Sequence, residues 1–178
     1  MKRSFEVTSL SVKYENPWMR VIELKTRTDG KNGIYGVVER SDSVTVIIET
    51  DDNKVLFVRQ FRYPTNNYSW EIPMGGINPG ELPKDRAIRE LEEETGCSVE
   101  LERIGEFYPV PGLTPQKAYV YYGTISYEEI KSIIEYDEKT DEITERKFFS
   151  QDDIKAMIAS HEITDGFTLC SLFIFARR

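Results

Sequence analysis

Hydrophobic and polar residues alternate along the first forty positions, the pattern of half-buried β-strands. The alternation runs through residues 4–15, 18–27 and 34–40, and a turn-forming segment at 29–33 separates the last two runs. We therefore expect a small antiparallel N-terminal sheet. Because three strands of this size bury little core alone, the sheet is expected to pack on another surface.

Apolar runs of strand length continue through the rest of the chain. The turn-forming Asp-Asp-Asn at 51–53 separates the run 43–50 from the run 55–62. The acidic segment 127–141 fits either a short helix or a long loop. The remaining expected strands are 43–50, 55–62, 99–108, 117–125 and 142–149. The expected helices are 81–96, 151–159 with Ser150 as its N-cap, and 165–176.

The sequence of the helix expected at 81–96 contains signals for both of its ends. Pro83 suits a first-turn position, and Gly96 suits a left-handed C-cap. Ala87, Ile88 and Leu91 recur at spacings of three and four, which predicts an apolar stripe that packs on a sheet.

Carboxylates gather on another face of the same helix. Glu90, Glu93 and Glu94 are three or four residues apart, so their side chains are expected to be neighbours. Like charges at this spacing cost a few tenths of a kcal/mol per pair, and a bound divalent cation removes that cost. A solvated acidic face is the alternative interpretation.

Composition narrows the function classes. The chain has 178 residues with a formal charge of −8, which argues against a general nucleic-acid binder. A single histidine, His161, leaves catalysis to carboxylates. With two cysteines, no secretion-signal core in the first residues and no apolar run of membrane-spanning length, a soluble cytoplasmic protein without a membrane partner is expected.

The region from Gly75 to Cys97 resembles the signature box of the Nudix hydrolases, G-x5-E-x7-R-E-U-x-E-E-x-G-U, where U is a bulky apolar residue. Cys97 departs mildly from the pattern, in a slot that is usually aliphatic. The matching residues are Gly75, Glu81, Arg89, Glu90, Leu91, Glu93, Glu94, Gly96 and Cys97.

This resemblance implies an α+β fold, an α/β/α sandwich with a mixed sheet, preceded by the small N-terminal sheet. Residues 42–178 would form the hydrolase domain, and residues 1–41 would form strands that build a homodimer. The expected order of elements agrees with that architecture.

The resemblance also implies a metal site for Mg²⁺, with Mn²⁺ as the alternative ion. In the family the box helix supplies the ligands, so Glu90, Glu93 and Glu94 carry over, with the backbone carbonyl of Met74 as a further ligand. Arg89 is expected to orient a carboxylate. Glu81 would ligate through water or assist the helix N-terminus.

The substrate has to be inferred from outside the box. Segments 55–64, 70–76 and 108–114 resemble the ADP-ribose and ADP-sugar pyrophosphatase branch, which implies hydrolysis of ADP-ribose to AMP and ribose 5-phosphate. Another nucleoside diphosphate sugar, such as GDP-mannose or a UDP-sugar, is the nearest alternative. A nucleotide-binding sensor without catalysis is a further alternative.

Four residues match substrate-binding positions of that branch. Trp18 and Tyr35 would stack on the adenine, with packing within the sheet as an equal alternative. Arg62 would contact the diphosphate or sugar, and Arg40 would lie near the nucleotide. A plain surface charge is the alternative, and it suits Arg40 better than it suits Arg62. Arg59 and Glu71 are weaker candidates.

The general base is expected in the acidic stretch 141–145, where some relatives carry a glutamate. Glu142 is the first choice and Glu145 the second, and a merely solvated loop is the alternative. Other relatives place an acid near position 116, but Gln116 cannot act as a base.

Overall fold

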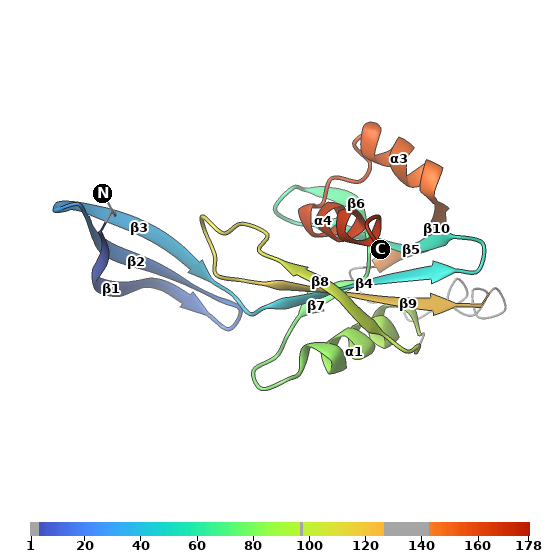
Figure 1. Cartoon of the computed structure of the whole chain (residues 1–178), viewed down its shortest axis with the longest axis horizontal. Helices are drawn as coiled ribbons and strands as arrows, with labels where there is room; N and C mark the ends of the chain where they lie inside the picture. Colours follow the sequence, from blue (N-terminus) through green and yellow to red (C-terminus); the bar gives the residue numbers. More distant parts are fainter. Residues whose placement is uncertain (1–3, 97, 127–142) are drawn as a thin grey trace. The chain divides into compact units, whose positions relative to one another are not determined.

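The computed structural model describes residues 4–96, 98–126 and 143–178, and its elements fall into two compact units (Figure 1). One unit contains residues 1–42 together with 108–117, and the other contains residues 43–107 and 118–178. Segment 108–117, which we expected within the second domain, thus groups with the N-terminal strands. In that unit the Val38 amide donates to the Leu113 carbonyl at 2.9 Å.

The N-terminal unit is built on the expected three-stranded antiparallel sheet, in the order β1-β2-β3. Its strands are β1 (Phe5–Asn16), β2 (Met19–Thr28) and β3 (Lys31–Glu39). The turn between β2 and β3 has Asp29 at φ 48° and Gly30 at φ 80°. Both angles are positive, which suits an Asp-Gly hairpin turn whose twist matches that of the strands.

This sheet leaves an unusual amount of apolar surface open within its own unit. Leu10, Leu24 and Tyr35 are paired across the three strands. The side chains of Leu10 and Tyr35 are 56% and 47% exposed. A row of apolar side chains on a thin sheet needs another surface to cover it.

The second unit contains a seven-stranded sheet with the core order β10-β5-β4-β9-β8, to which β6 adds beside β5 and β7 beside β4. The pair β4·β9 is parallel and the other pairs are antiparallel, so the sheet is mixed, as predicted. The strands are β4 (Ser43–Thr50), β5 (Lys54–Arg62), β6 (Asn67–Glu71), β7 (Met74–Gly76), β8 (Glu102–Phe107), β9 (Ala118–Ile125) and β10 (Ile143–Ser150).

The strands β6 and β7 were not expected from the sequence. They are short, and their residues include Asn67, Ser69 and two glycines, which have low β-propensity. Pairing with β5 and β4 places them in the sheet, so tertiary contacts override local preference here.

Among the described residues, three helices cover the two faces of this sheet, α1 on one side and α3 and α4 on the other (Figure 1). They are α1 (Pro83–Thr95), α3 (Gln151–Ala159) and α4 (Gly166–Phe175). Ser150 caps α3 as predicted, because its hydroxyl accepts from the Asp153 amide. Alternate residues of β5 separate the two cores, with Leu56 facing α1 and Phe57 facing α3 and α4.

Within the described residues, none of the helices combines the length and the apolar character needed to cross a membrane.

Candidate functional site

The helix α1 begins at Pro83, two residues after the expected start at 81, and it ends at the predicted C-cap. Pro83 lies in the first turn, and Gly96 takes the left-handed C-cap with φ 67°, donating its amide to the Glu92 carbonyl at 2.8 Å. The Arg146 guanidinium, from β10, hydrogen-bonds the Glu94 carbonyl in the last turn. A cation here complements the negative end of the helix dipole and ties α1 to the sheet.

The expected apolar stripe fixes the rotation of α1. Ala87 and Leu91 are fully buried in the core beneath the sheet, and Ile88 packs at its edge. With this stripe turned inward, Glu90 and Glu94 lie along the boundary between helix and sheet, 6% and 8% exposed. Two carboxylates one helical turn apart are thus withdrawn from water.

Glu93 does not share this environment. Its side chain is 50% exposed, and its carboxylate accepts from Arg89 Nη1 at 2.8 Å and Arg86 Nη1 at 3.3 Å. The three carboxylates expected on one face therefore differ: Glu90 and Glu94 are buried, whereas Glu93 is half-exposed and paired with two arginines.

The strand β7 comes very close to Glu90 of the buried pair. A Cβ atom built on Gly75 would lie 2.2 Å from Glu90 Oε2, well inside contact distance. A side chain at position 75 would therefore occupy the place of the Glu90 carboxylate. Gly75 follows Met74 in β7, so the strand that carries the proposed carbonyl ligand borders Glu90.

Arg89 links the outer carboxylates of the box. Its guanidinium donates to Glu81 Oε1 at 2.6 and 3.1 Å, and to Glu93. Glu81 also accepts from the Asn78 amide at 2.9 Å. That amide, then Arg89, lowers the pKa of Glu81, so this carboxylate is ionised and fixes the loop to the helix.

Arg86 also belongs to this cluster of charged residues, although it was not predicted from the sequence. Its side chain is only 12% exposed, and its guanidinium forms an ion pair with Glu90 Oε2 as well as with Glu93. The i to i+4 spacing from Arg86 to Glu90 was the available signal.

Glu94 is the most perturbed group of the site. Burial raises its pKa to about 8, and nearby Glu71 adds to the rise, while Arg62, Arg146 and Arg86 oppose it. No described residue hydrogen-bonds Glu94 Oε2. A buried carboxylate oxygen without a partner is costly when ionised, and a bound cation would remove the cost.

Arg62, Glu71 and Gln60 form a network beside Glu94. Arg62 makes a bidentate interaction with Glu71, at 3.0 Å from Nε to Oε1 and 2.5 Å from Nη2 to Oε2. Gln60 Nε2 also donates to Glu71, at 3.1 Å. Glu71 is 1% exposed, whereas 38% of the Arg62 side chain is exposed. The buried Glu71 therefore holds the Nε–Nη2 edge of the Arg62 guanidinium, while the arginine side chain stays partly exposed.

The side chains present fit a divalent cation in chemistry. Oxygen donors are what Mg²⁺ and Mn²⁺ prefer, and Glu94 Oε2 is buried without a hydrogen-bond partner among the described residues, while the buried Glu90 Oε2 is paired with Arg86. As the described side chains stand, no three acidic, His or Cys groups converge closely enough to hold an ion.

The structure describes only one of the two candidate general bases. Glu142 lies outside the described residues. Glu145 lies in β10, directly across from Arg59, on the face of the sheet opposite α1. It binds Lys147 at 2.8 Å and Arg59 at 2.5 Å, and Lys147, then Arg59, lowers its pKa. These contacts do not favour Glu145 as a base for the α1 carboxylates.

The other predicted binding residues belong to the N-terminal unit. Trp18 is at the tip of the β1–β2 hairpin, 75% exposed, where Asn16 Oδ1 accepts from its amide at 2.9 Å. The Tyr35 hydroxyl donates to the Gly112 carbonyl at 2.6 Å and so joins β3 to segment 108–117. Arg40 is exposed just after β3. Gln116 is buried in the same unit and donates to the Ser41 carbonyl at 2.8 Å.

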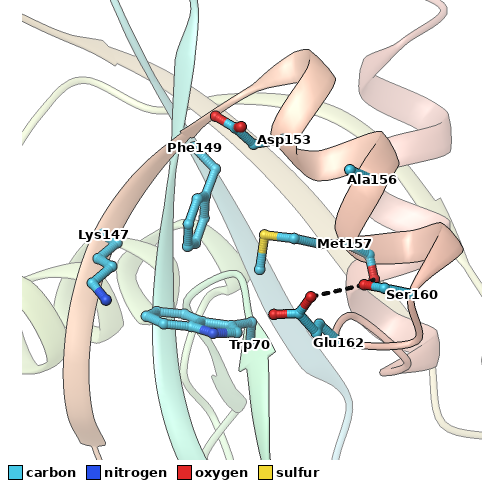
Figure 2. Close-up of a pocket in the computed structure, with 8 residues that line it drawn as sticks. All are labelled: Trp70, Lys147, Phe149, Asp153, Ala156, Met157, Ser160 and Glu162. Carbon is cyan, nitrogen blue, oxygen red and sulfur yellow. Dashed lines mark hydrogen bonds between the residues drawn. The ribbon is translucent and has the colours of Figure 1, made fainter.

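A separate cavity of about 490 Å³ lies between β10, β6 and α3 (Figure 2). Figure 2 shows Trp70, Phe149 and Met157 around it, with Ser160 donating to Glu162 at 2.8 Å on one side. Trp70, Phe149 and Met157 belong to the core on the α3 side of the sheet. This cavity is therefore distinct from the carboxylate pair on α1.

Comparison with known proteins gives a family and several relatives. The NUDIX domain family matches residues 39–167 of the chain. An ADP-ribose pyrophosphatase of Bacillus subtilis (strain 168) is 34% identical over 142 residues, which are 79% of this chain and 75% of that protein.

Two further relatives are matched over shorter stretches. A methanol dehydrogenase activator of Bacillus methanolicus is 34% identical over 115 residues, 64% of this chain and 62% of that protein. An ADP-sugar pyrophosphatase of Mus musculus is 39% identical over 83 residues, 44% of this chain and 37% of that protein. The chain thus spans less than two thirds of each of these two relatives.

Proposed function

The chain belongs to the Nudix hydrolase family, and from this premise we propose that it cleaves ADP-ribose to AMP and ribose 5-phosphate with Mg²⁺. That it is a hydrolase of pyrophosphate bonds follows from the family. The observation that carries the proposal is the buried pair Glu90 and Glu94, in which Glu94 Oε2 lacks a hydrogen-bond partner among the described residues.

The proposed ion would be held by Glu90 and Glu94, with Glu93 and the Met74 carbonyl as further ligands. Bound there, Mg²⁺ supplies charge that polarises the diphosphate and lowers the pKa of a bound water. Gly75 supports this assignment, because it lets the backbone of β7 approach the Glu90 carboxylate. Mn²⁺ offers the same oxygen chemistry.

The arginines of the site have separate tasks in this proposal. Arg62 is held by Glu71 along the Nε–Nη2 edge of its guanidinium, and the remaining donors of the group would contact the diphosphate or the sugar. Arg89 joins Glu81 to Glu93 and would keep the outer carboxylate in place. Neither arginine needs to lose a proton, since guanidinium groups remain charged at neutral pH.

The reaction also needs a general base. We propose Glu142, which would accept the proton of the attacking water. The alternative Glu145 is held by Lys147 and Arg59 on the other face of the sheet, and its lowered pKa makes it a weak base.

Residues 1–41 are proposed to form a homodimer, and residues 42–178 the hydrolase domain. The apolar row of Leu10, Leu24 and Tyr35 supports an interface on the N-terminal sheet. Trp18 and Tyr35 would stack on the adenine, and Arg40 would lie near the nucleotide. The exposed rings of Trp18 and Tyr35 are compatible with stacking.

ADP-ribose is preferred as the substrate because of the relative from Bacillus subtilis, which is matched over most of both chains. The mouse relative, described as an ADP-sugar pyrophosphatase, favours an ADP-sugar as the second candidate. GDP-mannose and UDP-sugars remain alternatives with the same diphosphate chemistry.

The test is product analysis after incubation of the purified protein with Mg²⁺ and each of ADP-ribose, ADP-glucose, GDP-mannose, UDP-glucose and NADH. AMP and ribose 5-phosphate from ADP-ribose at the highest kcat/KM are expected. Preferred cleavage of another member would replace the substrate, and binding of a nucleotide without any cleavage would favour a sensor.

A further inference from the structure

The Arg86 guanidinium is paired with the carboxylate of Glu90, which is also a ligand of the proposed metal site. Its guanidinium forms an ion pair with Glu90 Oε2, and both side chains are nearly buried, at 12% and 8% exposed. Ion pairs withdrawn from water are screened less than surface pairs. In this state Arg86 therefore supplies the counter-charge that lowers the free-energy cost of burying the Glu90 carboxylate.

A divalent cation that used the same oxygen would meet this guanidinium at short range. Repulsion between like charges a few Å apart amounts to a few kcal/mol near a protein surface. Arg86 would have to leave Glu90 before the oxygen could be shared with a metal.

The structure holds a second place for the displaced guanidinium. Arg86 Nη1 already lies 3.3 Å from Glu93 Oε2, and the Glu93 side chain is 50% exposed. A small rotation of the arginine could therefore exchange the buried partner for the outer one. Arg89 binds the other oxygen of Glu93, which holds that carboxylate where Arg86 can reach it.

We propose that Arg86 is a tethered counter-cation that stabilises Glu90 in the metal-free protein and competes with the divalent ion for it. The proposal rests on the metal site of the proposed function but does not depend on which nucleotide is cleaved. It makes two properties change in opposite directions, because loss of the guanidinium favours metal uptake and disfavours the metal-free fold.

The test is titration calorimetry of metal-free protein with Mn²⁺ alone, together with the melting temperature in EDTA. Arg86→Gln removes the charge while keeping much of the side chain. Its Mn²⁺ affinity is expected to rise about tenfold, while its melting temperature in EDTA falls below that of the wild type. Lys155→Gln, which removes an exposed helical ion pair with Asp152, is the matched control and should change neither property by much.

An unchanged or weaker Mn²⁺ affinity of Arg86→Gln would overturn the proposal, since a purely structural arginine would lower stability and affinity together. If Arg86→Gln does not fold, Arg86→Lys carries the test. Its weaker pairing should raise affinity about threefold, and an equal or lower affinity would again overturn the idea. Absence of Mn²⁺ uptake by the wild type would remove both this inference and the metal site, whereas normal uptake with no gain in the variants removes this inference alone.

Discussion

The Glu90 carboxylate lies in the space that a side chain on Gly75 would occupy, with 2.2 Å between Glu90 Oε2 and a Cβ built on that glycine. The two residues are far apart in sequence, one in β7 and one in α1. Their contact brings the backbone of β7 to the Glu90 carboxylate, and it makes position 75 a sensitive probe of the site.

Gly75→Ala is expected to reduce kcat/KM by at least tenfold with little loss of stability. The added methyl group meets the far end of a flexible side chain, so Glu90 can turn aside and the fold survives. Steady-state kinetics and thermal melting check this result. Gly36→Ala, where the new Cβ meets nothing within 4 Å, should leave both unchanged.

Replacement of the outer carboxylate should separate catalysis from folding. Glu93→Gln is expected to lose most turnover, about a hundredfold, because Glu93 is a proposed ligand and also holds Arg86 and Arg89. Its half-exposed side chain makes a large stability loss unexpected. Unchanged kcat in a normally melting variant would remove Glu93 from the proposed site.

The raised pKa of Glu94 predicts a pH-dependent penalty in the metal-free protein. The folded-state pKa of about 8 lies above the ordinary value of 4.5. The folded state therefore holds its proton more tightly, and stability falls as the pH rises from about 4.5 through 8.

Glu94→Gln removes this penalty. In EDTA at pH 8 the variant should be more stable than the wild type, by at most a few kcal/mol, with the gain vanishing near pH 4.5. Added Mg²⁺ should stabilise the wild type more than the variant. Denaturant titrations at several pH values measure the difference, and a variant that is less stable at pH 8 would contradict the electrostatic account.

The apolar row on the N-terminal sheet predicts a homodimer that one charge can disrupt. Leu10→Lys should shift the protein toward a monomer in light scattering, because it buries an unpaired charge in the proposed interface. Ser11→Lys is the control, since the next residue of a strand points to the opposite face. A wild type that is strictly monomeric would remove the interface and weaken the stacking roles of Trp18 and Tyr35.

Local rules determined much of α1 and of the strands. Pro83 and Gly96 mark the ends of the helix because their backbone preferences act within a single turn. Ala87 and Leu91 predict the buried stripe because helical spacing fixes which side chains are neighbours. The family was likewise accessible from the signature box, which is a property of consecutive residues, and the resemblance implied the mixed sheet.

Only the tertiary structure decided how the carboxylates differ from one another. Helical spacing groups Glu90, Glu93 and Glu94, but burial of Glu90 and Glu94 and exposure of Glu93 depend on how α1 rests on the sheet. The pairing of Arg62 with Glu71 and the placing of Glu145 beyond the sheet depend on strand register in the same way. Charge and spacing are written along the chain, whereas burial, which sets the energy of a charge, arises only when distant segments pack together.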